Sequence, residues 1–192
     1  TEPEVGAFRA VSLSPGSNGR DGWAVTDGQQ MAHWNGEDWE FVPAPTRVLH
    51  TVAMLSVQDG WVAGYKYNQA ERTPVFYRWN GIDWLEVAHP GPDAVTAMSF
   101  SSPEDGWAVG WNGAMYHWDG VRWEALERLV TGTLLGVVTL APDDAWASGA
   151  GGAILHWDGT RWEQVDSGTD IYLEALAFAA PDLGWAMGNL YS

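Results

Sequence analysis

The chain has 192 residues, 46% of them hydrophobic, and its 14 tryptophans supply enough apolar surface to fill the core of a folded domain. Its formal net charge of −16 repels phosphate groups, which excludes nucleic acids and anionic membrane surfaces as ligands. The absence of Cys excludes a disulfide framework, and no apolar run approaches the roughly 20 residues of a membrane-spanning helix.

The expected elements, taken in chain order, are short strands that recur in a fixed sequence. Five runs rich in β-branched and aromatic residues are expected as first strands: residues 8–13, 48–55, 95–100, 134–140 and 173–178. Each is followed by a turn and by a second strand that a small residue and a Trp open: Trp23, Trp61, Trp107, Trp146 and Trp185. Four third strands end at Trp34, Trp79, Trp118 and Trp157, and a fourth strand begins at a further Trp five residues later.

The spacing of these motifs predicts the fold. Second-strand tryptophans are 38, 46, 39 and 39 residues apart, and one insertion between Gly64 and Val75 accounts for the long interval. A period of about 40 residues, with Gly, Pro, Asp or Asn at every break and no helical apolar periodicity, is typical of a β-propeller. We predict an all-β propeller of four-stranded antiparallel blades. Tryptophans at a fixed position of each repeat are best explained by packing between blades, so we expect Trp23, Trp61, Trp107 and Trp146 to be largely buried.

The blade count follows from the strands that are present. Four blades are complete, and the fifth has only its inner half, so we predict five blades in a single domain over residues 1–192. The expected repeats cover residues 7–46, 47–93, 94–132, 133–171 and 172–192. Two alternatives for closing the fifth blade stay open. Residues 2–5 resemble an outer strand and could complete this blade. Alternatively, the natural chain continues, and the 192 residues are a fragment of a longer propeller. A partner or self-association at this edge is a third way to cover it.

The Trp-Asx-Gly motifs carry a family resemblance. The segment from Gly106 to Trp123 resembles the repeat of photosystem II assembly-factor propellers and the wider sialidase-like Asp-box repeats. The resemblance implies the propeller fold. The turn at Asp119 and Gly120 is shorter than the usual Asp box, and the first two repeats have Asn35 and Asn80 in place of Asp. Tight hairpins favour Asx and Gly for their own geometry, so we interpret the motif as structural.

Two repeated polar positions are candidate sites. His33, His117 and His156 share one position of three repeats, with Arg78 in the fourth, and equivalent positions of successive blades lie too far apart to share a metal ion. We therefore expect each ring to bond backbone or a neighbouring blade, and we expect neither a metal nor a cofactor. Asp21, Asp59, Asp105 and Asp144 recur before each second-strand Trp, which favours a turn role because catalysis needs unlike residues.

The departures from the repeat indicate the candidate binding face. The insertion brings Tyr65, Tyr67 and Arg72, and the equivalent turn of the third repeat brings Trp111 and Asn112. Aromatic rings with flanking amides suit stacking on a sugar or holding a peptide. The alternative is that these loops were elaborated by drift and that their rings only cover a neighbour.

Three functions of different classes follow. The first is a non-catalytic binding or scaffolding propeller that contacts protein or glycan. The second is a lectin with one sugar site per blade at the Trp-Asx-Gly turns. The third is a glycosidase, for which Asp27 and Glu71 are the available acids. Residues 1–6 do not resemble a signal peptide, and we expect an extracytoplasmic location: secreted, periplasmic or on the cell surface.

Overall fold

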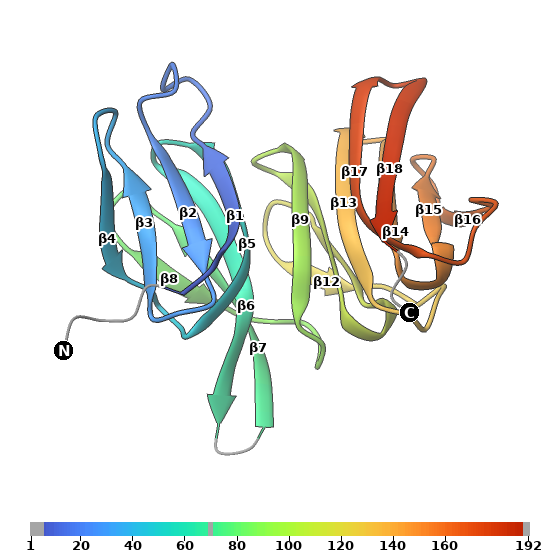
Figure 1. Ribbon diagram of the computed structural model, residues 1–192, viewed down its shortest axis with the longest axis horizontal. Helices are drawn as coiled ribbons and strands as arrows, with labels where there is room; N and C mark the ends of the chain where they lie inside the picture. Colours follow the sequence, from blue (N-terminus) through green and yellow to red (C-terminus); the bar gives the residue numbers. More distant parts are fainter. Residues whose placement is uncertain (1–5, 69–70, 190–192) are drawn as a thin grey trace. The chain divides into compact units, whose positions relative to one another are not determined.

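The computed structural model describes residues 6–68 and 71–189 as antiparallel β-sheets joined by turns (Figure 1). The chain divides into two compact units, Thr1–Val95 and Thr96–Ser192. Each sheet falls inside one of the expected repeats, and we call the sheets blades 1 to 5 in chain order. The expected pairing of residues 2–5 with blade 5 lies outside the described residues. Within the described part of the chain, no helix is long and apolar enough to cross a membrane.

The first unit holds blades 1 and 2, each a meander in which sequential strands pair. Blade 1 consists of β1 (Phe8–Leu13), β2 (Gly22–Thr26), β3 (Gln30–Trp34) and β4 (Trp39–Pro43). Blade 2 consists of β5 (Val48–Ser56), β6 (Asp59–Asn68), β7 (Glu71–Trp79) and β8 (Trp84–Val87).

The second unit holds blades 3, 4 and 5, and the first strand of blade 3 starts at Val95. Blade 3 consists of β9 (Val95–Ser102), β10 (Asp105–Gly110), β11 (Met115–Trp118) and β12 (Trp123–Ala125). Blade 4 consists of β13 (Leu134–Ala141), β14 (Asp144–Gly149), β15 (Ile154–Trp157) and β16 (Trp162–Val165). Blade 5 has two described strands, β17 (Tyr172–Ala180) and β18 (Leu183–Asn189).

The core of each unit lies between blades and is built around a second-strand Trp. In the first unit Trp23 packs against Trp79 and Trp84 of blade 2, with ring centroids 5.0 and 5.4 Å away. The expected burial is observed here, since Trp23 is only 4% exposed. Large apolar side chains that alternate along the strands surround the indole, because successive side chains of a strand point to opposite faces.

The same arrangement recurs in the second unit. Trp107 is 1% exposed and packs against Trp157 and Trp162 of blade 4, each with its ring centroid 5.0 Å away. Trp146 is less buried than Trp107, in the intermediate range. Its neighbour in blade 5 is Phe178, at 5.8 Å, and the described part of that blade has no third or fourth strand to cover the indole.

The outer hairpins confirm the turn chemistry read from the sequence. In blade 3 the carboxylate of Asp119 accepts the backbone N–H groups of Val121 and Arg122, each at 2.8 Å. Gly120 follows with φ 89°, a left-handed conformation that a side chain would strain. The equivalent Asn35, Asn80 and Asp158 accept backbone N–H groups in the same way. These acceptors are used within the turns, which weakens the hypothesis of a sugar site in every blade.

Candidate functional site

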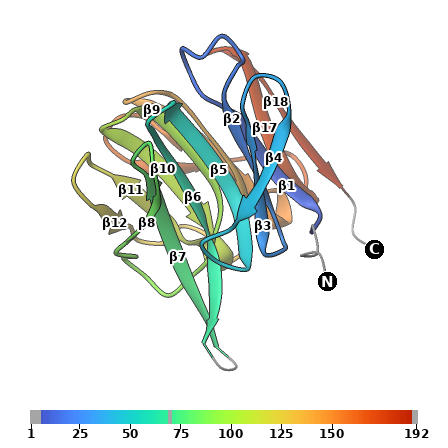
Figure 2. The ribbon, with the colours of Figure 1, turned by 90° about the vertical axis from the view of Figure 1, so that its left-hand side faces the viewer.

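The insertion in blade 2 is an extension of two strands. The β6–β7 pairing continues past the blade through Tyr65 opposite Pro74 and Tyr67 opposite Arg72 to Asn68 opposite Glu71. Figures 1 and 2 show these strand ends projecting beyond the other strands of the first unit. We call the hairpin from Tyr65 to Pro74 the aromatic arm. The sequence predicts a loop here, but the two strands continue instead, and successive side chains alternate between the faces of the arm.

The aromatic side chains of the arm form an ordered row. Tyr65 and Tyr67 are two residues apart and so project from the same face of β6. Tyr65 is buried and meets the ring of His50 edge-on at 5.3 Å, and its carbonyl accepts the Thr46 hydroxyl at 3.2 Å. Tyr67 meets Tyr65 edge-on at 5.4 Å and is 52% exposed. An exposed ring is therefore held in place by a buried one.

The other face of the arm is polar. Lys66 extends to Glu86 of β8, with 2.7 Å between ammonium and carboxylate. Glu86 also accepts the hydroxyl of Tyr77, and burial together with this carboxylate raises the pKa of Tyr77 to about 12. The phenol stays neutral near pH 7 and can keep donating its hydrogen bond. These contacts tie the base of the arm to blade 2.

The second candidate group lies in the second unit, at the turn between β10 and β11. Asn112 adopts φ 53°, where the equivalent turn of blade 4 has Gly151 at φ 66°. Its carbonyl accepts the guanidinium of Arg128 at 3.3 Å. Beside it lies a pocket of about 390 Å³ lined by Asn112 and residues 128–131. Trp111, which precedes it, is half-buried.

The predicted site residues therefore form two groups. Tyr65 and Tyr67 are in contact with one another, and Arg72 lies opposite Tyr67 in the strand pairing of the same arm. Trp111 and Asn112 form a turn of the second unit. The proposed glycosidase acid Asp27 has other partners: it binds Arg9 at 2.6 Å and accepts the N–H of Ala7 at 2.7 Å. The hydrogen bond from Arg9 lowers the pKa of this carboxyl.

The repeated histidines have a partner that the sequence analysis missed. His117 bonds the carboxylate of Asp105 at 2.8 Å and lies against Trp107, with ring centroids 4.4 Å apart. The pairs His33–Asp21 and His156–Asp144 repeat this arrangement in blades 1 and 4. The expectation that the rings bond backbone or a neighbouring blade was wrong, because the partner is an acid of the same blade. A constant separation of 12 residues between acid and His was the available signal.

Blade 2 has an arginine in place of this histidine. Arg78 binds Asp59 through two nitrogens, at 2.8 and 2.9 Å, and its guanidinium lies over Trp61, 5.2 Å from the ring centroid. The separation here is 19 residues, because the arm lies between the two side chains. Equivalent acids and bases of every complete blade are thus engaged inside their own sheet. No group of His, Asp or Glu in the described residues could hold a metal ion.

Removing one of these acids is expected to destabilise the fold. Asp105→Ala leaves the half-buried His117 ring and the Ser101 hydroxyl without their acceptor, for an expected loss of about 1–3 kcal/mol in the free energy of unfolding. Asp105→Asn is the matched control, because its amide oxygen can still accept. Urea unfolding measures both. Equal small losses for the two variants would contradict a role for the His–Asp pair.

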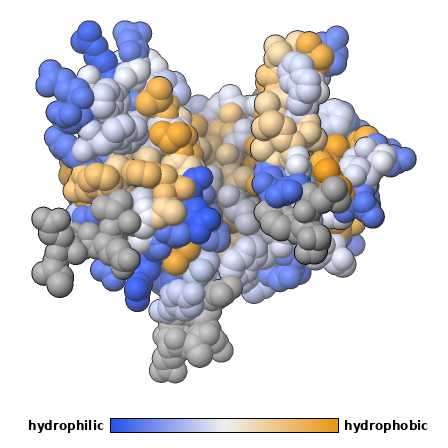
Figure 3. Space-filling view, viewed as in Figure 1, coloured by the Kyte–Doolittle hydropathy of each residue, from blue (hydrophilic) through white to orange (hydrophobic). Residues whose placement is uncertain are grey.

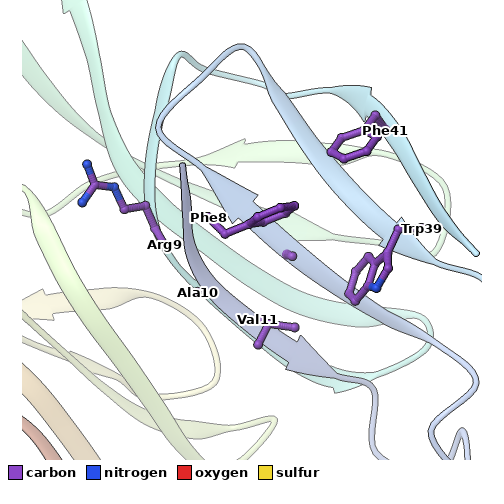
Figure 4. A pocket seen from close by; sticks show the side chains of 7 residues that line it. Phe8, Arg9, Ala10, Val11, Trp39 and Phe41 are labelled. Atoms are coloured by element: carbon purple, nitrogen blue, oxygen red, sulfur yellow. The ribbon is translucent and has the colours of Figure 1, made fainter. Parts of the chain in front are cut away.

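A further hollow, on blade 1, was not predicted. It measures about 560 Å³ and is lined chiefly by Phe8, Val11, Ala24, Trp39 and Phe41. Figure 4 shows that Phe8, Val11, Trp39 and Phe41 project to one side of the sheet while Arg9 extends away from them. We call this hollow the open pocket. Phe8 is 58% and Val11 63% exposed, and no residue of β1 is fully buried.

Comparison with known proteins places the fold. No family profile matches the chain, and no curated protein is significantly similar in sequence. A solved structure described as "YCF48 from Cyanidioschyzon merolae" is 19% identical, with a TM-score of 0.68 over 97% of this chain and 65% of its own. Another, "YCF48 bound to D1 peptide", is 18% identical, with a TM-score of 0.51 over 94% of this chain and 75% of its own.

A WD40 propeller is similar as well. The "Crystal structure of RRP9 WD40 repeats" is 11% identical, with a TM-score of 0.67 over 87% of this chain and 54% of its own. The chain thus spans between about half and three quarters of the length of these structures. With its four-stranded antiparallel blades, the chain has a β-propeller fold that resembles YCF48, as the motifs predicted.

Proposed function

We propose that this chain is a non-catalytic, protein-binding scaffold whose aromatic arm holds an extended, basic segment of another polypeptide. The observation that carries the proposal is Tyr67, a half-exposed ring fixed edge-on by the buried Tyr65. Tyrosines contribute large contact area at a low cost in conformational entropy, and they are enriched among residues that dominate binding energy. Trp111 and Asn112 form a separate candidate contact surface on the second unit.

The chemistry of the partner follows from charge and from the similar structures. A formal net charge of −16 attracts Lys-rich and Arg-rich segments and speeds their encounter with the protein. One similar structure is described as holding a peptide. An extended polypeptide can lie across the ring of Tyr67, and its Lys and Arg side chains can pair with exposed Asp and Glu residues of the protein. We also propose that the protein is extracytoplasmic. Fractionation of the producing cells should then find it outside the cytoplasmic fraction.

Replacing Tyr67 is expected to weaken this binding. Tyr67→Ala should reduce affinity for basic peptides selected on the parent protein by at least about tenfold, or roughly 1.4 kcal/mol, because the exposed ring is lost while Tyr65 keeps the arm in place. Tyr172→Ala, at an exposed tyrosine of blade 5, is the matched control. Peptide arrays identify the ligands, and titration calorimetry measures their affinity.

The same experiment separates the proposal from its alternatives. Binding to basic peptides should fall with rising salt, because screening weakens attraction between exposed charges. Equal affinities for the parent and the folded Tyr67→Ala variant would remove the arm as the site. Binding on a glycan array that the same substitution abolishes would replace the polypeptide partner with a carbohydrate.

A further inference from the structure

The turn between the first two strands of blade 1 departs from the repeat. Two residues join these strands in each of blades 2 to 5, whereas residues 14–21 join β1 to β2, and we call this segment the blade 1 loop. Its ends are tied together, because Ser14 donates its N–H to the carbonyl of Asp21 at 2.9 Å and its hydroxyl to the carboxylate of the same residue. Figure 3 shows mostly hydrophilic residues over the end of blade 1 from which this loop projects (Figure 1).

The tip of the loop is a tight turn built on Asn18 and Gly19. Arg20 donates its N–H to the carbonyl of Ser17 at 3.2 Å, and φ is 55° at Asn18 and 74° at Gly19. Positive φ at both central residues is the mark of a type I′ turn, for which Asn-Gly is a preferred sequence. The indole N–H of Trp34 donates to the carbonyl of Gly19 at 2.8 Å, so the turn is held against its own blade.

An Asn followed by a Gly is also a chemically reactive pair. The backbone nitrogen of the Gly attacks the side-chain Cγ of the Asn, and a five-membered succinimide forms as the bond from Cγ to the amide nitrogen breaks. That nitrogen leaves as ammonia and takes the proton of the Gly N–H. Water then opens the ring at either carbonyl, which gives aspartate or isoaspartate. Gly favours the attack because it has no side chain to obstruct it.

The sequence contains four such pairs, and the structure restrains two of them through their side chains. They begin at Asn18, Asn35, Asn80 and Asn112. In the outer hairpin of blade 1, Oδ1 of Asn35 accepts the N–H groups of Glu37 and Asp38 at 2.9 and 3.0 Å. Asn80 is held by the same two bonds in blade 2. Neither Cγ can approach the Gly nitrogen until both bonds are broken.

The pair at Asn112 is restrained by packing. Gly113 is buried, and a Cβ built on it would lie only 1.9 Å from the carbonyl oxygen of Val130. The peptide between Asn112 and Gly113 therefore lacks the room to rotate into the geometry of a succinimide.

Asn18 has neither restraint. Among the residues that the structure describes, nothing bonds to its carboxamide, and a side chain built on Gly19 would meet no atom within 4 Å. We propose that Asn18 is a site of spontaneous deamidation. Every bond that forms or breaks lies within Asn18 and Gly19, with water as the only other reactant, so the reaction depends on this turn alone.

Both products change the blade 1 loop. Each adds a negative charge to the formal net charge of −16, three residues before Asp21, which binds His33. Isoaspartate also carries the backbone through the side chain and so lengthens it by one carbon. The turn at Asn18 and the bond from Trp34 to Gly19 are then not both retained. We expect the isoaspartate form to loosen the loop that closes on the His33–Asp21 pair.

Peptide mapping by mass spectrometry tests the proposal. The folded protein is incubated at neutral and mildly alkaline pH, and Asn, aspartate and isoaspartate are quantified at all four pairs. Asn18 should convert at least about tenfold faster than Asn35 or Asn80, because those two must first lose two hydrogen bonds each. The rate should rise with pH, since the attacking nitrogen has to give up its proton.

Unfolding provides the control for the role of structure. In guanidinium chloride the four pairs should convert at similar rates, because the restraints are gone and the Asn-Gly sequence is the same. Asn18→Gly is the matched variant, since Gly accepts positive φ and keeps the turn. Its folded form should accumulate acidic species on ion exchange more slowly than the parent. Equal rates at Asn18, Asn35 and Asn80 in the folded protein would overturn the proposal, as would an Asn18→Gly variant that acidifies as fast as the parent.

Discussion

Trp107→Ala is expected to lower the free energy of unfolding by about 3–5 kcal/mol, the largest loss of any substitution considered. The indole is 1% exposed and fills the space between blades 3 and 4, where it meets Trp157, Trp162 and His117. Removing it creates a cavity lined by rigid rings, which cannot collapse to fill the space.

Urea unfolding followed by circular dichroism measures this loss. Trp185→Ala is the control, because it removes the same side chain where it is 55% exposed, and its expected cost is below about 1 kcal/mol. Similar losses for the two would mean that Trp107 does not hold the two blades together.

Acidification is expected to destabilise the first unit through His89. Burial lowers the pKa of this imidazole to about 4, against an attraction to the carboxylate of Asp93. The ring stacks on Phe76 at 4.9 Å and accepts the N–H of Gly91 through Nδ1, which requires a lone pair on that nitrogen. The neutral ring is therefore the form that the fold accommodates.

The sign of the effect follows from proton binding. Below pH 6.5 His89 is protonated in the unfolded chain but stays neutral in the folded protein. The free energy of unfolding therefore falls with pH until the folded ring is protonated near pH 4. The loss over that range is about 2–3 kcal/mol after allowance for partial exposure.

Unfolding of the parent and of His89→Gln across this pH range measures the contribution of His89. Carboxylates titrate in both proteins, so the difference between the two pH profiles isolates the imidazole. The difference should grow steadily from neutral pH toward pH 4. Parallel profiles would show that His89 does not determine acid stability.

The strands could be predicted because local pattern and tertiary packing agree. The five expected first strands begin within one residue of where β1, β5, β9, β13 and β17 begin. The Trp-Asx-Gly turns could also be predicted, because a tight hairpin needs an Asx side chain that bonds nearby backbone and a Gly that adopts positive φ. Because the motif repeats at a nearly constant spacing, the one longer interval identifies the insertion that contains Tyr65 and Tyr67.

What escaped prediction depends on contacts between residues distant in sequence. The His–Asp pairs join the end of a third strand to the start of a second, and only the antiparallel register brings them together. The open pocket depends on which face of blade 1 stays uncovered. Composition gives no sign of that, because equivalent valines differ in burial: Val52 of blade 2 is 7% exposed, whereas Val11 of blade 1 is 63% exposed.

The aromatic arm has a consequence for the kinetics of binding. Its strands continue those of blade 2 with regular pairing from Gly60 opposite Trp79 to Asn68 opposite Glu71, so a partner meets strands that are already paired. When little rearrangement accompanies docking, encounter sets the association rate and contact quality sets the dissociation rate. Ligands that differ in how well they cover Tyr67 would then differ chiefly in residence time, whereas net charge would govern how fast they arrive.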